Sequence, residues 1–433
     1  VLANACCFSV GPYRVPNALI EGWGVRTNNP PCGAMRGFGN VQTCFAAEAQ
    51  MDKLAKALSL DPVEFRLLNA LETGDILITG QEITGTAPVK EVLTSLAQYP
   101  LPEPTKGELL DLPGGTGRTT DKSHVKRGVG YAASIKNLMF SEGFDDFSEA
   151  RCIVDDGEVL IKSACVEVGQ GFVTLVGQIV EETLGISDIT ILPVDTSIGS
   201  AGSTSASRQT WMSGGAVLKA CEAVVDALRL DLSSENGVAY EKSGLNLVSK
   251  DATHSIDIST ALRGRNYDEH VTHRHKRTFP LDHNGQGNAH VSFAFAAHRA
   301  VVDVDEELGL VRVIEIATSQ DVGRVLNPVQ ARGQIEGGIA QGLGLALLED
   351  LVLDNGKIVN ANFTDYLLPT SMDTPPIKIA SLIEQSEPGA PFGAKGIGEP
   401  PVISSTPAII SAVRNATGKK LSRVPIKPED LIF

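Results

Sequence analysis

Five short stretches combine glycine with polar or charged residues, which is the composition of loops that bring a ligand against the backbone. Glycine permits this close approach, and the backbone N–H groups of such turns bind phosphate or ring heteroatoms. Any one stretch alone is more typical of an ordinary turn, so only their combination indicates a ligand site. They are CGAMRGFGN (32–40), EVGQG (167–171), GSAGSTSASRQT (199–210), GQIEGGIAQGLG (333–344) and GAKGIGE (393–399).

Glu399 is the sharpest single candidate for chemistry. It follows Gly398 and precedes Pro400 and Pro401. A glutamate is ionised at neutral pH unless it is buried, so it can serve as a base. A following proline holds the residue before it extended, and a stiff backbone helps to aim a base. The alternative is that Glu399 only interacts with the dipole of the helix expected after it.

Other chemistries have weaker support. His273 and His275 alternate, as two metal ligands on one strand face would, but their charged surroundings favour an exposed basic loop. The segment GVGYAA (128–133) fits a dinucleotide pattern, yet no strand is expected before it and no helix after it. The serines of 203–207 lack the nucleophile elbow of hydrolases.

Composition excludes several classes of partner. The seven cysteines show no Cys-x-x-Cys spacing, which disfavours disulfides, a zinc site and an iron–sulfur cluster in this chain and favours a reducing, cytoplasmic location. The net charge of -15 argues against nucleic acid as a partner. No apolar run approaches the roughly 18 to 20 residues of a membrane span, so we expect no membrane partner.

The elements that must position these loops are mixed α and β without regular βαβ alternation, which predicts an α+β fold. A helix pair is expected over 41–71, with Asp61 as N-cap before Pro62. Hairpins are expected over 149–168 and 289–322. Further helices are expected over 88–99, 172–185, 209–230 and 329–350 and from about Ser405, and a strand over 188–195. The Pro- and Gly-rich segment 99–126 is the best candidate for a linker.

Together and in this order, these stretches resemble the molybdenum-binding subunit of the xanthine dehydrogenase and aldehyde oxidase family, and bacterial xanthine dehydrogenase-like subunits in particular. The resemblance implies a two-lobe molybdopterin-binding fold. Residues 1–98 would finish the first lobe, 99–126 would link, and 127–433 would form the second lobe. The resemblance covers most of the chain and includes GPYRVPN (11–17), VRTNNPPCGAMRGFGNVQ (25–42), EVGQG (167–171), SASRQTWMSGGAV (205–217), GQIEGGIAQGLGLALLED (333–350) and AKGIGEPP (394–401).

The resemblance also implies roles for individual residues. Glu399 matches the catalytic base. Phe38 and Tyr131 would flank a flat substrate ring, which stacking selects. Molybdenum would be held by the pterin and not directly by a side chain. The residues that would surround the cofactor are Arg36, Gly37, Gly169, Gln170, Gly171, Ala206, Ser207, Arg208, Gln334, Lys395, Gly396 and Gly398.

The implied activity is hydroxylation of an N-heterocycle such as xanthine, hypoxanthine or a similar purine, with oxygen from water. Asn4 aligns where xanthine-specific members carry an arginine, which leaves an aldehyde or a nicotinate-type substrate open. A third alternative is a structural subunit without cofactor, against which the intact Arg36, Gln170, Gln334 and Glu399 argue.

Several partners follow from the resemblance. Electrons would leave through [2Fe-2S] clusters and FAD, which we expect on an iron–sulfur subunit and an FAD subunit. The family's first lobe normally starts well before GPYRVPN. The resemblance therefore implies either that a further chain supplies the N-terminal part of the molybdenum subunit or that this chain is a piece of a cut one. The bacterial character of the chain favours the cytosine dinucleotide form of the pterin.

Overall fold

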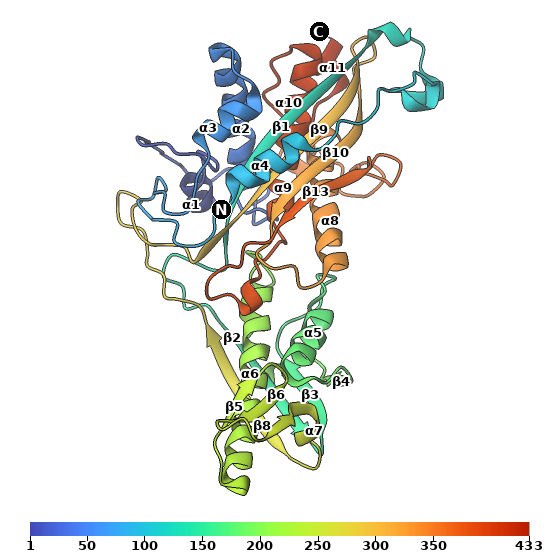
Figure 1. Ribbon diagram of the computed structural model, residues 1–433. Helices are drawn as coiled ribbons and strands as arrows, with labels where there is room; N and C mark the ends of the chain where they lie inside the picture. The colour runs from blue at the N-terminus through green and yellow to red at the C-terminus, as the bar shows by residue number, and fades with distance from the viewer. Residues whose placement is uncertain (433) are drawn as a thin grey trace.

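Two four-stranded sheets organise the chain, and they lie in the upper and lower parts of the elongated molecule in Figure 1. The computed structural model describes residues 1–432. The first sheet has the order β1 (Val125–Leu138), β9 (Ser292–Asp305), β10 (Leu310–Asp321), β13 (Ile377–Ile383). The second has the order β4 (Ile189–Ile191), β3 (Glu158–Ser163), β2 (Phe147–Asp155), β8 (Tyr267–Arg274).

The first sheet is covered by helices on both faces. Strands β1, β9 and β10 pair antiparallel, and β13 joins β10 in parallel. One face packs against α4 (Val89–Gln98), and the other packs against α8 (Pro328–Leu347) and α10 (Ser405–Thr417). All positions of β9 are therefore buried, as expected for a strand between two layers of helix.

Two glycines of β1 explain why its pattern resembled a nucleotide-binding loop. A Cβ atom on Gly128 would lie 2.1 Å from the carbonyl oxygen of Ala412, and one on Gly130 would lie 2.1 Å from the Ala412 nitrogen. Both glycines therefore let α10 pack directly on the strand. The segment 128–133 lies inside β1, so it forms no strand-to-helix turn and is not a dinucleotide site.

The N-terminal residues form α1 (Leu2–Cys7), α2 (Asn40–Leu58) and α3 (Pro62–Asn69). The predicted cap is confirmed, because the Asp61 carboxylate accepts hydrogen bonds from the backbone of Val63 at 2.8 Å and Glu64 at 3.1 Å. Residues 1–98 share a core with β1 and β9. The division into lobes at 98 and 127 stays a prediction.

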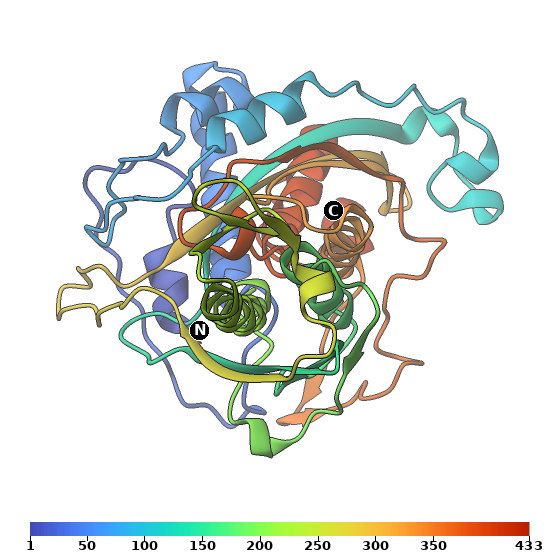
Figure 2. The ribbon, with the colours of Figure 1, turned by 60° about the horizontal axis from the view of Figure 1, so that its bottom comes forward.

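The segment 99–126 runs from α4 around the outside of the first sheet (Figure 2). It is attached by polar contacts, since the Arg118 guanidinium lies 2.6 Å from the Asp305 carboxylate and the Thr105 hydroxyl donates to Asp303 at 2.6 Å. The predicted linker is thus tied to the β9 strand.

The lower part packs α5 (Phe172–Leu184) and α6 (Gln209–Asn236) against the second sheet. The predicted hairpin of β2 and β3 is confirmed, and its turn places Asp156 at φ 51° and Gly157 at φ 88°. The expected exposed loop around His273 is wrong, because this segment forms β8 and pairs with β2. His273 lies against Gly215 of α6.

The remaining elements are short. Within residues 1–432, none of the helices combines the length and apolarity that a membrane span requires. The predicted closing helix is confirmed as α10, which a four-residue helix precedes. The short elements are β5 (Tyr240–Ser243), β6 (Asn246–Ser249), β7 (Ser255–Asp257), α7 (Ile258–Ala261), β11 (Leu353–Asp354), β12 (Lys357–Ile358), α9 (Pro400–Ile403) and α11 (Pro428–Ile432).

Candidate active site

A cavity of about 1020 Å³ lies between the two parts of the chain, and residues from all five glycine-bearing stretches line it. The upper part contributes 34–36, Phe38, Gln334 and 394–399. The lower part contributes 168–171 and 203–210, which precede or begin α5 and α6. The fold therefore brings together segments that the sequence could connect only by their composition.

Glu399 is fixed at the wall of this cavity and is only 8% exposed. Its Oε1 accepts a hydrogen bond from the Gly37 backbone at 3.1 Å, and its own backbone N–H donates to Ser207 Oγ at 2.9 Å. Its backbone is helical, at φ −101° and ψ −37°, so the predicted extended conformation is wrong. The side chain does not cap α9 but turns toward Gly37, which argues against a role as a simple helix-end charge.

Lys136 is a functional candidate that the sequence did not reveal. It is 1% exposed on β1, and its Nζ lies 3.3 Å from Glu399 Oε2. Nζ also donates to the backbone oxygen of Asn137 at 2.8 Å and to Asn137 Oδ1 at 2.7 Å. Burial lowers the pKa of Lys136, and the nearby Glu399 carboxylate opposes that shift. The only sequence signal was a lysine in the mostly apolar second half of β1.

Arg36 joins three of the cavity-lining stretches. Its Nε donates to the Gly398 carbonyl, and its Nη2 donates to the Gln334 carbonyl at 3.0 Å. Burial lowers the pKa of Arg36, and Glu399 again opposes the shift. Because both carbonyls belong to segments that line the cavity, Arg36 holds the wall around Glu399 in place.

The turn of Ala206 and Ser207 lines the cavity directly beside Glu399. Both residues have left-handed backbone, at φ 51° and 49°. Their backbone passes so close to Gly396 that a Cβ atom there would lie 1.8 Å from the Ser207 oxygen. Gly396 is therefore required at this crossing, which leads directly into Gly398 and Glu399.

The stretch EVGQG forms a compact turn before α5. The Glu167 carboxylate accepts hydrogen bonds from the backbone of Gly169 at 2.7 Å and of Gly171 at 3.0 Å. The Gln170 side chain bonds within the same turn, through Nε2 to the Val166 carbonyl at 3.0 Å. In contrast, the Gln334 carboxamide lines the cavity and makes no hydrogen bond with any of residues 1–432.

Two charged residues predicted to bind a cofactor line the cavity, but their charges are engaged inside the protein. The fully buried Arg208 guanidinium pairs with Asp146, with Nε 3.1 Å from Oδ2. Lys395 Nζ donates to Asp321 Oδ2 at 2.7 Å and to the Thr86 carbonyl at 3.0 Å. Both side chains anchor the loops that carry the wall.

The aromatic residues differ from the prediction. Phe38 lines the cavity and is 37% exposed. Tyr131 does not line it, because this position of β1 faces the core under α4, opposite Arg299 of β9. Phe140, Phe144 and Phe172 also line the cavity. Phe140 lies just after β1, and the Arg208 guanidinium lies 5.0 Å from its ring centroid.

Comparison with known proteins agrees with this geometry. Two family models, both described as a molybdopterin cofactor-binding domain, match residues 114–375 and 1–70. The chain is 30% identical to a probable xanthine dehydrogenase subunit of Bacillus subtilis, over 98% of this chain and 56% of that protein. It is 31% identical to the aldehyde oxidoreductase of Megalodesulfovibrio gigas, over 97% of this chain and 43% of that protein.

A solved structure supports the same relationship. The aldehyde oxidoreductase of Desulfovibrio desulfuricans superimposes with a TM-score of 0.80 at 27% identity, over 100% of this chain and 44% of that one. The chain thus spans about half the length of the relatives it matches. The α+β fold is confirmed, and the chain belongs to the molybdenum-binding subunits of the xanthine dehydrogenase and aldehyde oxidoreductase family.

Proposed function

We propose that this chain binds a molybdopterin cofactor and supplies the general base for hydroxylation of a flat N-heterocycle, such as a purine. The observation that carries the proposal is the buried Glu399 carboxylate, which the Gly37 N–H and the Lys136 ammonium hold at the wall of the cavity. A base that is fixed before the substrate binds needs no reorganisation during the reaction.

The cavity fits a pterin cofactor. The Gln334 carboxamide lacks a partner among residues 1–432, so it can bond to pterin heteroatoms. The left-handed turn of Ala206 and Ser207 and the glycines at 396 and 398 let the backbone approach a ligand closely. When bound, the molybdenum centre supplies the two-electron oxidation.

The chain itself moves the proton. Glu399 Oε1 is held by the Gly37 N–H, whereas Oε2 accepts no hydrogen bond from residues 1–432 and is available to accept a proton. The Lys136 ammonium, 3.3 Å away, stabilises the ionised carboxylate before the reaction. After proton transfer, Lys136 keeps its hydrogen bonds to Asn137, and these bonds hold its ammonium group beside Glu399.

The aromatic residues at the cavity support the proposed substrate class. Phe38 and Phe140 both line the cavity and provide faces for a flat ring. The buried Asn4 lines the same cavity and donates to Asn137 Oδ1 at 3.0 Å. An amide at this place offers no fixed positive charge, so an aldehyde or a nicotinate-type compound remains the alternative substrate. A panel of purines, nicotinate and aromatic aldehydes distinguishes these classes.

We further propose that the chain works in a cytoplasmic complex. The similar Bacillus subtilis protein is named as one subunit of a dehydrogenase, and this chain spans 56% of its length. The name of that relative supports partners that carry the [2Fe-2S] clusters and FAD. A partner that carries the N-terminal part of the molybdenum subunit belongs to the same proposal. The cytosine dinucleotide form of the pterin is part of the same proposal.

Replacement of Glu399 by glutamine in the complete complex tests the proposed base. The carboxamide keeps the size of the side chain but accepts no proton, so turnover should fall by about 10²- to 10⁴-fold, the usual contribution of a general base. Molybdenum content and thermal stability should remain unchanged. Glu64→Gln, at an exposed position of α3, is the matched control. Full turnover in Glu399→Gln would favour the structural-subunit alternative or another base.

A further inference from the structure

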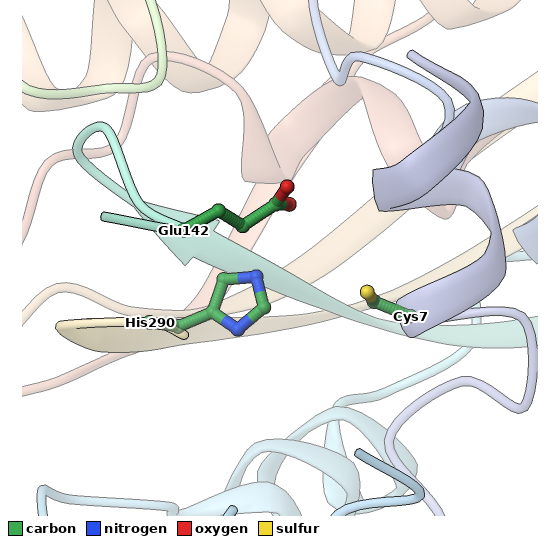
Figure 3. A group of neighbouring side chains, drawn as sticks. All are labelled: Cys7, Glu142 and His290. Carbon is green, nitrogen blue, oxygen red and sulfur yellow. The ribbon is translucent and has the colours of Figure 1, made fainter. Parts of the chain in front are cut away.

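A second cluster of polar side chains lies next to the main cavity. Cys7, Glu142 and His290 place a thiol, a carboxylate oxygen and a ring nitrogen within 4.8 Å of one another (Figure 3). Cys7 ends α1, Glu142 lies in the turn after β1, and His290 lies two residues before β9. Three segments that are distant in sequence thus converge on one point.

His290 shows that this convergence is unusual. The residue is 2% exposed, and neither ring nitrogen has a hydrogen-bond partner among residues 1–432. Its backbone is fixed on both sides by Gln81, which accepts from the His290 N–H at 2.9 Å and donates to the His290 carbonyl at 2.7 Å. A buried imidazole without a partner is rare in folded proteins, because such groups normally find one.

The ring is also held in position by its neighbours. Phe8 contacts it edge-on with centroids 5.0 Å apart, and Phe293 lies at 5.8 Å. Figure 3 shows the imidazole pointing into the space between Glu142 and Cys7. Burial lowers the pKa of His290 to about 3, helped by the charge of Lys136, so the ring is neutral and keeps a lone pair to donate.

The other two groups are fixed as well. Cys7 is 6% exposed at the end of its helix. Glu142 has left-handed backbone at φ 60°, and its N–H donates to the Ala289 carbonyl at 2.8 Å, which ties its turn to the residue before His290. Glu142 also lines the main cavity. The cluster is therefore closed on the Cys7 and His290 sides and borders the cavity on the Glu142 side.

We propose that Cys7, Glu142 and His290 bind a zinc ion whose fourth coordination position opens toward the cavity. Sulfur, imidazole nitrogen and carboxylate oxygen are the three donors that zinc takes, and three protein ligands with an open position are typical of zinc sites that bind water or a ligand. A thiolate and a carboxylate balance the two positive charges of the ion. Binding replaces the thiol proton with the metal, and that proton is released to solvent.

The geometry needs only a small contraction. Bonds of about 2.0–2.3 Å in a tetrahedral site separate ligand atoms by about 3.3–3.8 Å, within reach of the present limit of 4.8 Å. The charge of Lys136 is engaged by Glu399, so it is balanced within the main site. The zinc site is distinct from the proposed cofactor site and does not depend on the hydroxylase activity.

Zinc analysis of the full-length protein in its complex tests the proposal. After dialysis against Zn²⁺ and removal of excess metal, we expect about one zinc per chain. Zinc-edge X-ray absorption should show one sulfur ligand at about 2.3 Å and nitrogen or oxygen ligands at about 2.0–2.2 Å. A zinc signal without sulfur, or no retained zinc, would overturn the proposal. This measurement uses the unmodified protein and therefore does not depend on the folding of any variant.

Variants assign the ligands. Cys7→Ser and His290→Gln should each reduce the zinc content to near zero, whereas Cys6→Ser, at the neighbouring thiol outside the cluster, and His283→Gln, at an exposed position, should keep it. Retention of sulfur-bound zinc in Cys7→Ser would refute the assignment. Molybdenum is measured on the same samples: zinc without molybdenum would count against the proposed function alone, and molybdenum without zinc against the zinc site alone.

Discussion

Replacing Gly396 with alanine puts a methyl group into the crossing of two backbone segments at the cavity wall. The new Cβ would lie 1.8 Å from the Ser207 oxygen and 2.8 Å from the Ser207 carbonyl carbon. Both atoms belong to the backbone, so no side-chain rotation relieves the overlap. Ser207 is itself in a left-handed turn, which limits how far it can move.

The size of the effect follows from this overlap. To reach the 3.4 Å of an ordinary contact, the distance from Cβ to the Ser207 oxygen must grow by about 1.6 Å (3.4 minus 1.8). A displacement of about 1 Å at a reacting group already lowers turnover by about 10²-fold. Glu399 lies three residues further on and is tied to Ser207 through the 2.9 Å bond from its N–H. Overpacking of this kind also lowers the free energy of unfolding by about 1–3 kcal/mol.

The assay compares three variants of the complete complex by steady-state turnover and by chemical denaturation. Gly396→Ala should lower turnover by about 10²-fold and the free energy of unfolding by about 1–3 kcal/mol. Gly398→Ala, whose Cβ would lie 3.4 Å from Ser207 Oγ, should show a smaller effect. Gly333→Ala, a helical position with nothing within 4 Å, should keep full turnover and be as stable as the unmodified protein or up to about 1 kcal/mol more stable. If Gly396→Ala behaved like Gly333→Ala in both measurements, the proposed positioning of Glu399 by this wall would be wrong.

Three further predictions concern stability. Lys136→Met leaves the Glu399 carboxylate buried without its cation. The free energy of unfolding, measured by chemical denaturation, should therefore fall by about 3–5 kcal/mol, and an unchanged value would refute the ion pair. Gly130→Ala should lower the same free energy by about 1–3 kcal/mol, because its Cβ would overlap the α10 backbone, while Gly333→Ala should not. Burial lowers the pKa of His298 from 6.5 to about 3. The free energy of unfolding should therefore be highest above pH 6.5, where the imidazole is neutral, and should fall as the pH decreases from 6.5 toward 3. His298→Asn should flatten this pH dependence, and an equally steep dependence in the variant would contradict the assignment.

Local features of the fold were predictable because they depend on neighbouring residues. Asp61 and Pro62 define a helix start through a side-chain cap and a fixed φ angle, and the structure has that start. Asp156 and Gly157 define a hairpin turn because they tolerate positive φ, and the hairpin is present. The five glycine-bearing stretches identified in the sequence all contribute to the lining of the cavity.

Features that depend on long-range packing were not predictable. Tyr131 lies in the core and Lys136 reaches Glu399 because the two residues are on opposite faces of β1. The sequence does not show which of these faces packs against α4. The pairing of β8 with β2 turned an apparent loop into a strand. Arg208 reads as a ligand-binding residue in sequence, and only its buried partner Asp146 shows that it anchors the loop.

The central claim is that this chain holds a molybdenum cofactor. Plasma mass spectrometry of the complex purified from its native host, with identification of every accompanying chain, tests it most directly. We expect about one molybdenum atom per copy of this chain, with iron and flavin on the companion chains. An intact, folded complex without molybdenum would refute the proposed function and would make Glu399 and Lys136 a structural ion pair.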